Sequence, residues 1–315
     1  MKRIATIVES WPWIWSILAS LLMWIAIGVL SKQMSVQTLV INATVATFLA
    51  IIAIGQMFAI SGGDGGIDLS IPYTVTLTAF VSEGIMQGSN GKFVQGMVVC
   101  LVAGLLIGVL NAFLILGFKI PPIIGTLSSG YIVDSAGLVY AHGFSSGAVS
   151  PVLTGIVTHK VVGIPWVVIL TICLGLVFAI VLNRSPFGKA LLAMGQNRVA
   201  AQLAGIRVNR IRTASFILSG VLAAFGGVML SAYSGGAFLG MGSPFLLESI
   251  GAVVIGGTLI SGGKSTTLGT LGGALFLTMV VTLMEVTKLA IGIQDILEGV
   301  IVILVLLIAN RETAR

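Results

Sequence analysis

The chain carries very little charge for its length. Only 8% of its 315 residues are Asp, Glu, Lys or Arg, whereas soluble domains carry roughly 25%. Hydrophobic residues make up 57% of the chain. A chain of this composition cannot cover a water-facing surface with charged groups. It is therefore not an ordinary soluble enzyme, and we expect an all-α polytopic membrane protein.

Cysteine and metal-ligand patterns are also scarce. The two cysteines, Cys100 and Cys173, lie within apolar stretches, which argues against a disulfide framework and against a zinc site. His142 and His159 lie in an expected external loop without metal-ligand spacing, so we expect no metal. No Ser/His/Asp or Cys/His arrangement is evident, so the chain is not expected to be an enzyme by itself.

Apolar stretches recur along almost the whole chain. Hydropathy with breaks at Gly, Pro and charge clusters predicts about ten transmembrane helices within a single transmembrane domain, 1–315. The expected spans are 12–30, 38–60, 69–87, 94–117, 121–141, 164–183, 213–233, 247–262, 266–286 and 290–309. With both termini cytoplasmic, most of the 16 lysines and arginines fall on the cytoplasmic side, as the positive-inside rule requires. The net charge of +6 is read as this bias and not as a surface for nucleic acid.

The longest polar stretch, 184–212, contains basic residues and no acidic residue. Asn197 is a good N-cap and Gly205 a good C-terminal residue for a helix of about two turns. A helix so short needs support from neighbouring spans or from a partner. The small residues Ala200, Ala201 and Ala204 would let another protein approach closely. From composition alone, a solvated positive-inside loop remains the simpler interpretation.

Several motifs of the polar loop lie at 187–189, 193–197, 200–201 and 205–208. Together these segments resemble one family of membrane proteins, the permease subunits of bacterial ABC importers in the ribose-type and branched-chain amino-acid permease superfamily. Ser-Gly-Gly-Asp-Gly-Gly-Ile-Asp-Leu-Ser at 61–70 resembles a signature of the sugar branch, and 120–122, 252–258, 261–263 and 269–271 match further family blocks. The chain departs from the pattern at Asp64, Gly65 and Gly66, where it looks expanded.

This resemblance implies a mechanism and a set of partners. The 184–212 loop would be a cytoplasmic coupling loop that docks into an ATP-hydrolysing subunit. Its site residues would be Gly188, Lys189, Gly195, Asn197, Ala200, Ala201 and Gly205. The permease would work as a homodimer or heterodimer in the bacterial inner membrane, with an ABC ATPase subunit and an external substrate-binding protein. ATP and Mg would bind the ATPase, leaving no cofactor on this chain.

Polar and glycine-rich positions near the expected spans predict a translocation pathway. The candidates are Gly62, Gly63, Asp68, Ser70, Asp134, Gly256 and Gly257. Glycine-rich backbone at a membrane boundary needs protein or water to satisfy its polar groups, so a discontinuous helix could line the path at 61–70. Asp68 could equally be a helix cap. Asp134 lies inside an expected span, where an ionisable side chain is a functional candidate.

Other glycine-rich features have simpler explanations. The pairs Gly104 with Gly108 and Gly269 with Gly273 have the small-residue spacing of closely packed helices. Ile-Ser-Gly-Gly occurs at 60–63 and again at 260–263, which we attribute to coincidence or shared local geometry and not to duplication. The stretch 257–265 has the wrong spacing for a P-loop.

We expect the substrate to be a monosaccharide or related polyol because the 61–70 segment resembles the sugar branch. Two alternatives stay open. One is a branched-chain amino-acid permease of the same superfamily, and the other is an ion-coupled secondary transporter with Asp134 as its coupling residue.

Overall fold

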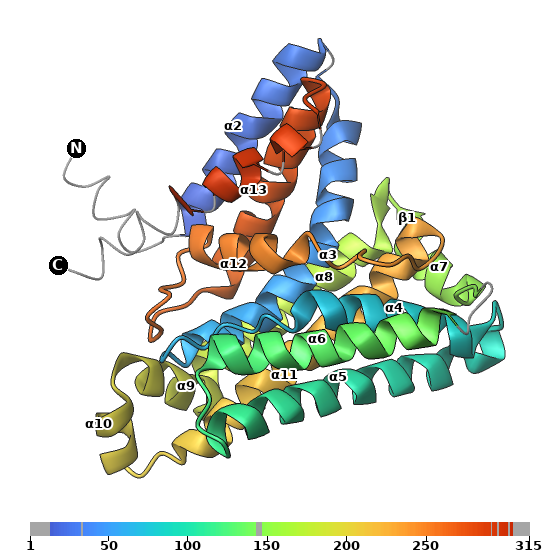
Figure 1. Cartoon of the computed structure of the whole chain (residues 1–315). Coiled ribbons are helices and arrows are strands. Elements are labelled where there is room, and N and C mark those ends of the chain that lie inside the picture. Colours follow the sequence, from blue (N-terminus) through green and yellow to red (C-terminus); the bar gives the residue numbers. More distant parts are fainter. Residues whose placement is uncertain are drawn as a thin grey trace, which may run out of the picture.

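The computed structural model describes residues 13–32, 34–142, 147–290, 292–294, 296–301 and 303–304, and most of them are helical (Figure 1). The elements in chain order are α2 (Trp13–Ser31), α3 (Val36–Ser61), α4 (Ile71–Met86), η1 (Asn90–Lys92), α5 (Phe93–Leu116), α6 (Pro122–His142), α7 (Pro151–Thr158), β1 (Lys160–Val161), β2 (Ile164–Pro165), α8 (Trp166–Arg184), α9 (Pro186–Gln196), α10 (Arg198–Leu203), α11 (Val208–Ser234), α12 (Phe245–Ile255) and α13 (Thr267–Val286). Strands β1 and β2 pair antiparallel in a short hairpin.

The prediction of about ten transmembrane helices is wrong. Within the described residues, six helical segments are long and apolar enough to cross a membrane: Ile14–Ser31, Val36–Ser61, Asn90–Leu116, Trp166–Arg184, Val208–Ser234 and Thr267–Val286. The cytoplasmic placement of both termini was deduced from ten crossings and stays a prediction, because six crossings also place both termini on one side. The termini themselves lie outside the described residues.

The physical reason for the overcount differs from segment to segment. Helices α4 and α12 have only 16 and 11 residues, whereas a crossing needs about 20. Helix α6 has 21 residues but carries several hydroxyl groups and Asp134. Residues 291, 295, 302 and 305–309 of the expected span 290–309 lie outside the described residues. A hydropathy window cannot distinguish a short apolar helix from a full crossing.

Helix α11 forms the centre of the bundle and packs against α5, α3 and α4. Its closest neighbour is α5, because glycines remove side chains from both helices where they cross. A Cβ on Gly104 would collide with the carbonyl oxygen of Gly220, and one on Gly108 would collide with the backbone of Phe216. The predicted packing role of Gly104 and Gly108 is confirmed.

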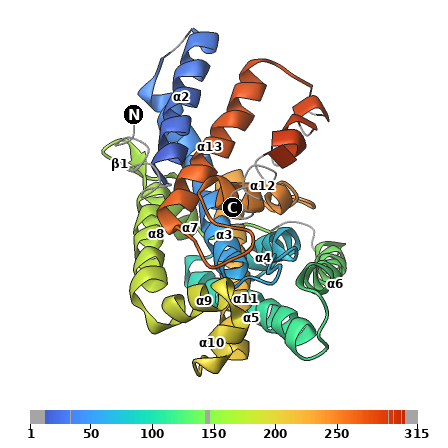
Figure 2. The same ribbon diagram turned by 90° about the vertical axis from the view of Figure 1, so that its left-hand side faces the viewer.

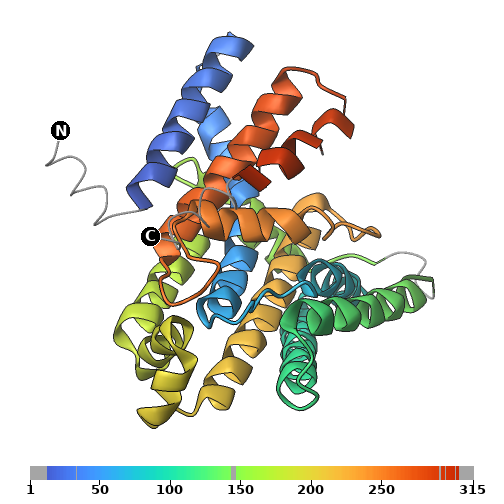
Figure 3. The same cartoon turned by 60° about the vertical axis from the view of Figure 1, so that its left-hand side comes forward.

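The bundle has two distinct ends. Helix α10 lies at one end, and the β1–β2 hairpin with α7 lies at the other (Figure 1). We call these the α10 end and the hairpin end. Figures 2 and 3 show the short helix α12 lying across the middle of the molecule, between the α2–α13 pair and α11.

Candidate functional site: the coupling loop and its glycine-rich partners

Both predicted ends of the short helix in the polar loop are confirmed. The Asn197 side chain caps α10, and its Oδ1 accepts a hydrogen bond from the Ala200 N–H at 2.9 Å. Gly205 has a φ of +83°. The N–H of Gly205 bonds the Gln202 carbonyl at 3.0 Å, and that of Ile206 bonds the Ala201 carbonyl at 3.0 Å. These two bonds form a Schellman motif, which ends the helix at a glycine.

Burial divides the predicted coupling residues into two groups. Lys189, Asn197, Ala200 and Gly205 are exposed, whereas Ala201 and Gly188 are buried. A Cβ on Gly188 would collide with the carbonyl groups at the end of α8, and Ala201 belongs to the hydrophobic core. The expected use of Ala201 as a contact for a partner is therefore wrong, because it packs against the chain itself.

The sequence analysis missed the most exposed apolar side chains of this loop. Val199 and Leu203 are 68% and 84% exposed, and they are spaced i, i+4 on α10, so they share one helix face. The sequence signal for this surface was the presence of two large apolar residues at helical spacing within a polar loop. Together they give the tip of the loop an apolar contact surface.

Asp64 joins the polar loop to the turn that follows α3. Its Oδ2 accepts hydrogen bonds from Arg198 at 2.8 Å and Arg212 at 3.0 Å, and Arg212 also bonds the Asp64 carbonyl at 3.2 Å. Partial burial alone would raise the pKa of Asp64. The hydrogen bond from Arg198 and the two positive charges outweigh it and hold the pKa below its ordinary value. Asp64 belongs to the expansion that departs from the family pattern, so that expansion forms an ion-paired link.

Three glycine-rich segments meet beside this ion pair, and we call their meeting point the glycine crossing (61–63, 195–196 and 261–265). The Gly263 N–H bonds the Ser61 carbonyl at 3.0 Å, and the Gln196 side chain bonds the Gly263 carbonyl at 3.2 Å. A Cβ on Gly195 would collide with the backbone of Ser61 and Gly263. Backbones approach this closely only where side chains are absent.

The two Ile-Ser-Gly-Gly segments form part of this crossing. Gly63, Gly262 and Gly263 all have positive φ, and a Cβ on Gly262 would run into the backbone of Gly63. The hydroxyl groups of Ser61 and Ser265 are 2.5 Å apart. The two copies of the tetrapeptide therefore pack against each other, but their turns differ, because Gly62 has a φ of −71° and the equivalent Gly262 has a φ of +85°.

Asp68 lies at the centre of a fully buried polar cluster. Its Oδ1 accepts bonds from the Ser70 N–H at 3.0 Å, the Ser70 hydroxyl at 2.6 Å and Asn111 at 3.2 Å. Its Oδ2 accepts a bond from the Ser219 hydroxyl at 2.7 Å. Asn111 also accepts a hydrogen bond from Ser129. The cluster joins α4, α5, α6 and α11. The N-cap residue of α4 is Ser70, so the interpretation of Asp68 as the helix cap is wrong, and Asp68 instead accepts a bond from the N–H of that residue.

The remaining pathway candidates lie outside the Asp68 cluster and have different structural roles. Gly62 is the C-cap residue of α3. Gly256 packs against the backbone of Gly269, and Gly257, with a φ of +87°, ends α12. Asp134 is half-buried on α6, near Tyr73. The structure does not bring Asp134 into the Asp68 cluster.

Two buried or half-buried carboxylates were absent from the predicted site. Glu83 on α4 is 4% exposed, and its Oε1 has no hydrogen-bond partner. Glu248 in the first turn of α12 lines two adjoining cavities. Both lie inside expected spans, 69–87 and 247–262, so the rule that made Asp134 a candidate was the available signal for them as well.

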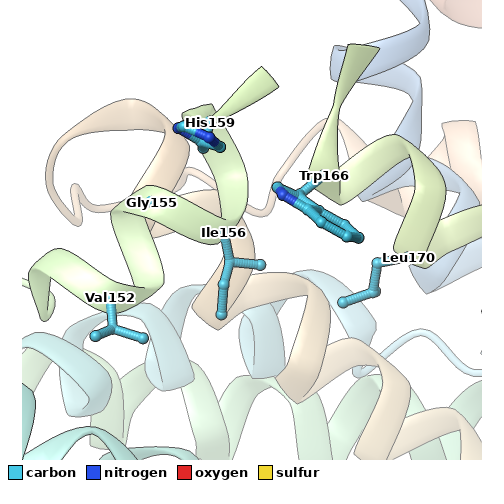
Figure 4. A pocket seen from close by; sticks show the side chains of 6 residues that line it. All are labelled: Val152, Gly155, Ile156, His159, Trp166 and Leu170. Carbon is cyan, nitrogen blue, oxygen red and sulfur yellow. The ribbon is translucent and has the colours of Figure 1, made fainter. Parts of the chain in front are cut away.

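A groove at the hairpin end runs between α7 and the start of α8 (Figure 4). It has a volume of about 450 Å³ and is lined by Val152, Ile156, His159, Trp166 and Leu170. His159 is exposed, as expected, whereas the side chain of His142 lies outside the described residues. Over the part of the chain that the structure describes, no three His, Cys, Asp or Glu side chains gather as a metal site would require.

Comparison with known proteins gives a consistent family. The family model described as "Branched-chain amino acid transport system / permease component" matches residues 38–309. The ribose import permease protein RbsC of Haemophilus influenzae is 31% identical over 273 residues, covering 83% of this chain and 81% of the relative. The autoinducer 2 import system permease protein LsrC of an Enterobacter species is 28% identical, covering 88% and 80%. A probable ABC transporter permease protein of Sinorhizobium fredii is 30% identical, covering 83% and 76%. No solved structure matches the chain.

Proposed function

Because the chain belongs to the family of permease components of branched-chain amino-acid transport systems, we propose that it forms the membrane pathway for a monosaccharide or a related polyol. It is a permease subunit of a bacterial ABC importer and a multi-pass protein of the inner membrane. This family assignment replaces the alternative of an ion-coupled secondary transporter. The substrate proposal is supported by relatives that import ribose or autoinducer 2.

We further propose that α10 docks into a separate ATPase subunit on the cytoplasmic side. The observation that supports this is the exposure of Val199 and Leu203 on one face of a helix whose two ends are both capped. A rigid helix with an apolar face can fill a groove on a partner at low entropic cost. The basic residues around it would favour an acidic rim on that partner.

Movement of α10 would reach the membrane helices through two contacts. The ion pair of Asp64 with Arg198 and Arg212 joins α10 to the turn after α3 and to the start of α11. The glycine crossing joins the same loop to the segment between α12 and α13. Closely packed backbone is hardly compressible, so a displacement of one segment is transmitted to the segment packed against it. In this mechanism ATP and Mg act on the ATPase, and this chain contributes positioning only.

The partners can be tested by co-purification from native membranes. Leu203→Glu and Val199→Glu should release the ATPase subunit from a still-folded permease, because each places a carboxylate in the apolar contact. Val162→Glu is the matched control, since Val162 is 97% exposed and belongs to the β1–β2 hairpin, at the opposite end of the bundle from α10 (Figure 1). Retention of the ATPase by the Leu203 variant would contradict the proposed docking face. A second permease chain and an external binding protein should accompany the wild type.

Uptake by reconstituted vesicles tests the substrate class. With ATP inside and a binding protein outside, labelled ribose should enter and labelled leucine should not. The family description names branched-chain amino acids, so leucine uptake without ribose uptake would establish that alternative. Uptake that continues without ATP would contradict the ABC mechanism.

A further inference from the structure

A non-helical segment, 235–244, returns into the bundle after α11 ends. Gly235, the C-cap of α11, has a φ of +75° and turns the chain back. The Gly242 N–H then bonds the Thr76 hydroxyl at 3.1 Å, and a Cβ on Gly242 would collide with the Pro72 carbonyl. Thr76 and Pro72 lie in the first two turns of α4, so the segment runs along α4 from its end towards its beginning.

The beginning of α4 lies near the middle of α11. Just before α4, Asp68 bonds Ser219 of α11 at 2.7 Å, and in its second turn Thr78 bonds the Ala224 carbonyl at 3.3 Å. Helix α11 has 27 residues and is about 40 Å long. Gly242 therefore lies about half-way along α11, which is itself long and apolar enough to cross the bilayer.

Non-helical backbone at that depth is tolerated only where protein buries it or where it lines a water-filled space. Gly242 is buried, but residues 238–240 and 243–244 are exposed. Phe238 and Leu239 are 56% and 51% exposed. The exposed stretch thus requires water or another protein chain beside it.

The end of the segment next to Gly235 lies beside a buried carboxylate. A Cβ on Gly236 would lie 3.9 Å from the unpartnered Oε1 of Glu83. A carboxylate that is 4% exposed and has a free oxygen is costly in an apolar bundle unless a polar group or water partners it.

A cavity of about 350 Å³ opens beside the segment. Its lining combines the aromatic rings of Phe48, Tyr233 and Phe238 with the polar groups of Ser234, Thr278 and Glu248. Glu248 and Pro244 also line an adjoining cavity of about 420 Å³ that includes Ser243. Aromatic faces with a few convergent hydroxyl and carboxylate groups are suited to a compound that has both apolar ring faces and hydroxyl groups.

We infer that segment 235–244 and Glu248 line the water-filled translocation path, where the cavity makes transient contact with a polyhydroxylated substrate. This inference deepens the proposed function and rests on it. The sequence predicted that the path runs past the glycines at 62–63 and 256–257, but those glycines lie where helices end. The inferred path instead runs past segment 235–244, which the sequence analysis left as a connection between two expected spans.

Thiol accessibility in lipid nanodiscs tests the inference, and the native chain supplies the control. Cys173 is exposed near the middle of α8, and Cys100 is buried. We would compare native Cys173 with Ser243→Cys in a Cys173→Ser background, using a small cationic methanethiosulfonate reagent. The Ser243→Cys thiol should react at least tenfold faster than Cys173. The Cys173→Ser chain alone measures any reaction of Cys100.

Equal, slow reaction of the two thiols would overturn the inference, whether lipid or a second copy of the chain covers the segment. This measurement needs neither transport nor ATPase. A reactive Ser243→Cys thiol in a protein that imports no ribose would contradict the proposed function and not the inference. An unreactive thiol in a protein that still imports ribose would contradict the inference and not the proposed function.

The contribution of Glu248 needs a transport readout. Glu248→Gln should raise the apparent KM for ribose several-fold while the ATPase still co-purifies. Glu285→Gln is the matched control, because Glu285 is an exposed acid near the end of α13. Equal KM values for the two variants would contradict substrate contact at Glu248.

Discussion

Two aspartates, four residues apart, have opposite environments. Asp68 is 2% exposed, and neutral hydroxyl and amide groups partner both of its carboxylate oxygens. The Asp64 side chain is 46% exposed and pairs with two arginines from other segments. Asp68 holds four helices in one arrangement. Asp64 joins the turn after α3 to a loop that, in our proposal, moves with a partner. Burial therefore separates the structural acid from the coupling acid.

The largest effect is expected at Asp68. Asp68→Leu would leave the Ser70 N–H and the Ser219 hydroxyl without the acceptor that Asp68 provides, and each unpaired buried group costs about 1–3 kcal/mol. We expect the variant to fail to accumulate as a monodisperse protein in detergent. Asp68→Asn keeps one acceptor oxygen and should be less damaging. A monodisperse Asp68→Leu variant with unchanged thermal stability would show that the cluster is not structural.

A second effect is expected at Gly195, where the loop touches the glycine crossing. Gly195→Ala would push the backbones of Ser61 and Gly263 apart, and such overpacking costs typically 1–3 kcal/mol. The midpoint of thermal unfolding should fall. Gly155→Ala is the control, because a Cβ there would meet nothing within 4 Å and Gly155 lies in helix α7. Equal behaviour of the two variants would mean that the crossing is not tightly packed.

Asp64→Asn should separate stability from coupling. An exposed ion pair such as that with Arg198 contributes less than about 1 kcal/mol. The Arg212 side chain is only 5% exposed and would exchange a carboxylate for a neutral acceptor, so the unfolding midpoint should fall slightly. Loss of the link between Arg198, Arg212 and the turn after α3 should lower the ribose imported per ATP hydrolysed, with the ATPase still bound. Arg198→Gln should act in the same direction. Unchanged import per ATP in both variants would remove Asp64 from the coupling route.

The sequence predicted local structure better than it predicted the burial of side chains or the number of helices that cross the membrane. It identified both ends of α10, because Asn197 and Gly205 act through their own backbone neighbours. It identified the glycine packing of α5 because the small-residue spacing lies within one helix, although the partner helix α11 is distant in the sequence. It failed on Ala201, whose burial depends on distant parts of the chain, and on α4 and α12, whose apolar composition resembles that of full crossings. The contacts of Asp64 with Arg198 and Arg212 could not be predicted, because residues more than 130 positions apart meet only through the fold.

The smallest effect is a pH dependence that belongs to Asp64 alone. Its pKa is lower in the folded protein than the ordinary value of 3.8. A carboxyl with a lowered folded pKa stabilises the fold at pH above its unfolded pKa, and this contribution is lost as the pH falls through the folded value. The difference in unfolding midpoint between wild type and Asp64→Asn should therefore be constant from pH 7 to about pH 5 and shrink below about pH 4. Because the pair is partly exposed, added salt should also reduce the difference at pH 7. A difference that grows on acidification would mean that Asp64 binds its proton more tightly in the folded protein, contrary to its pairing with two arginines.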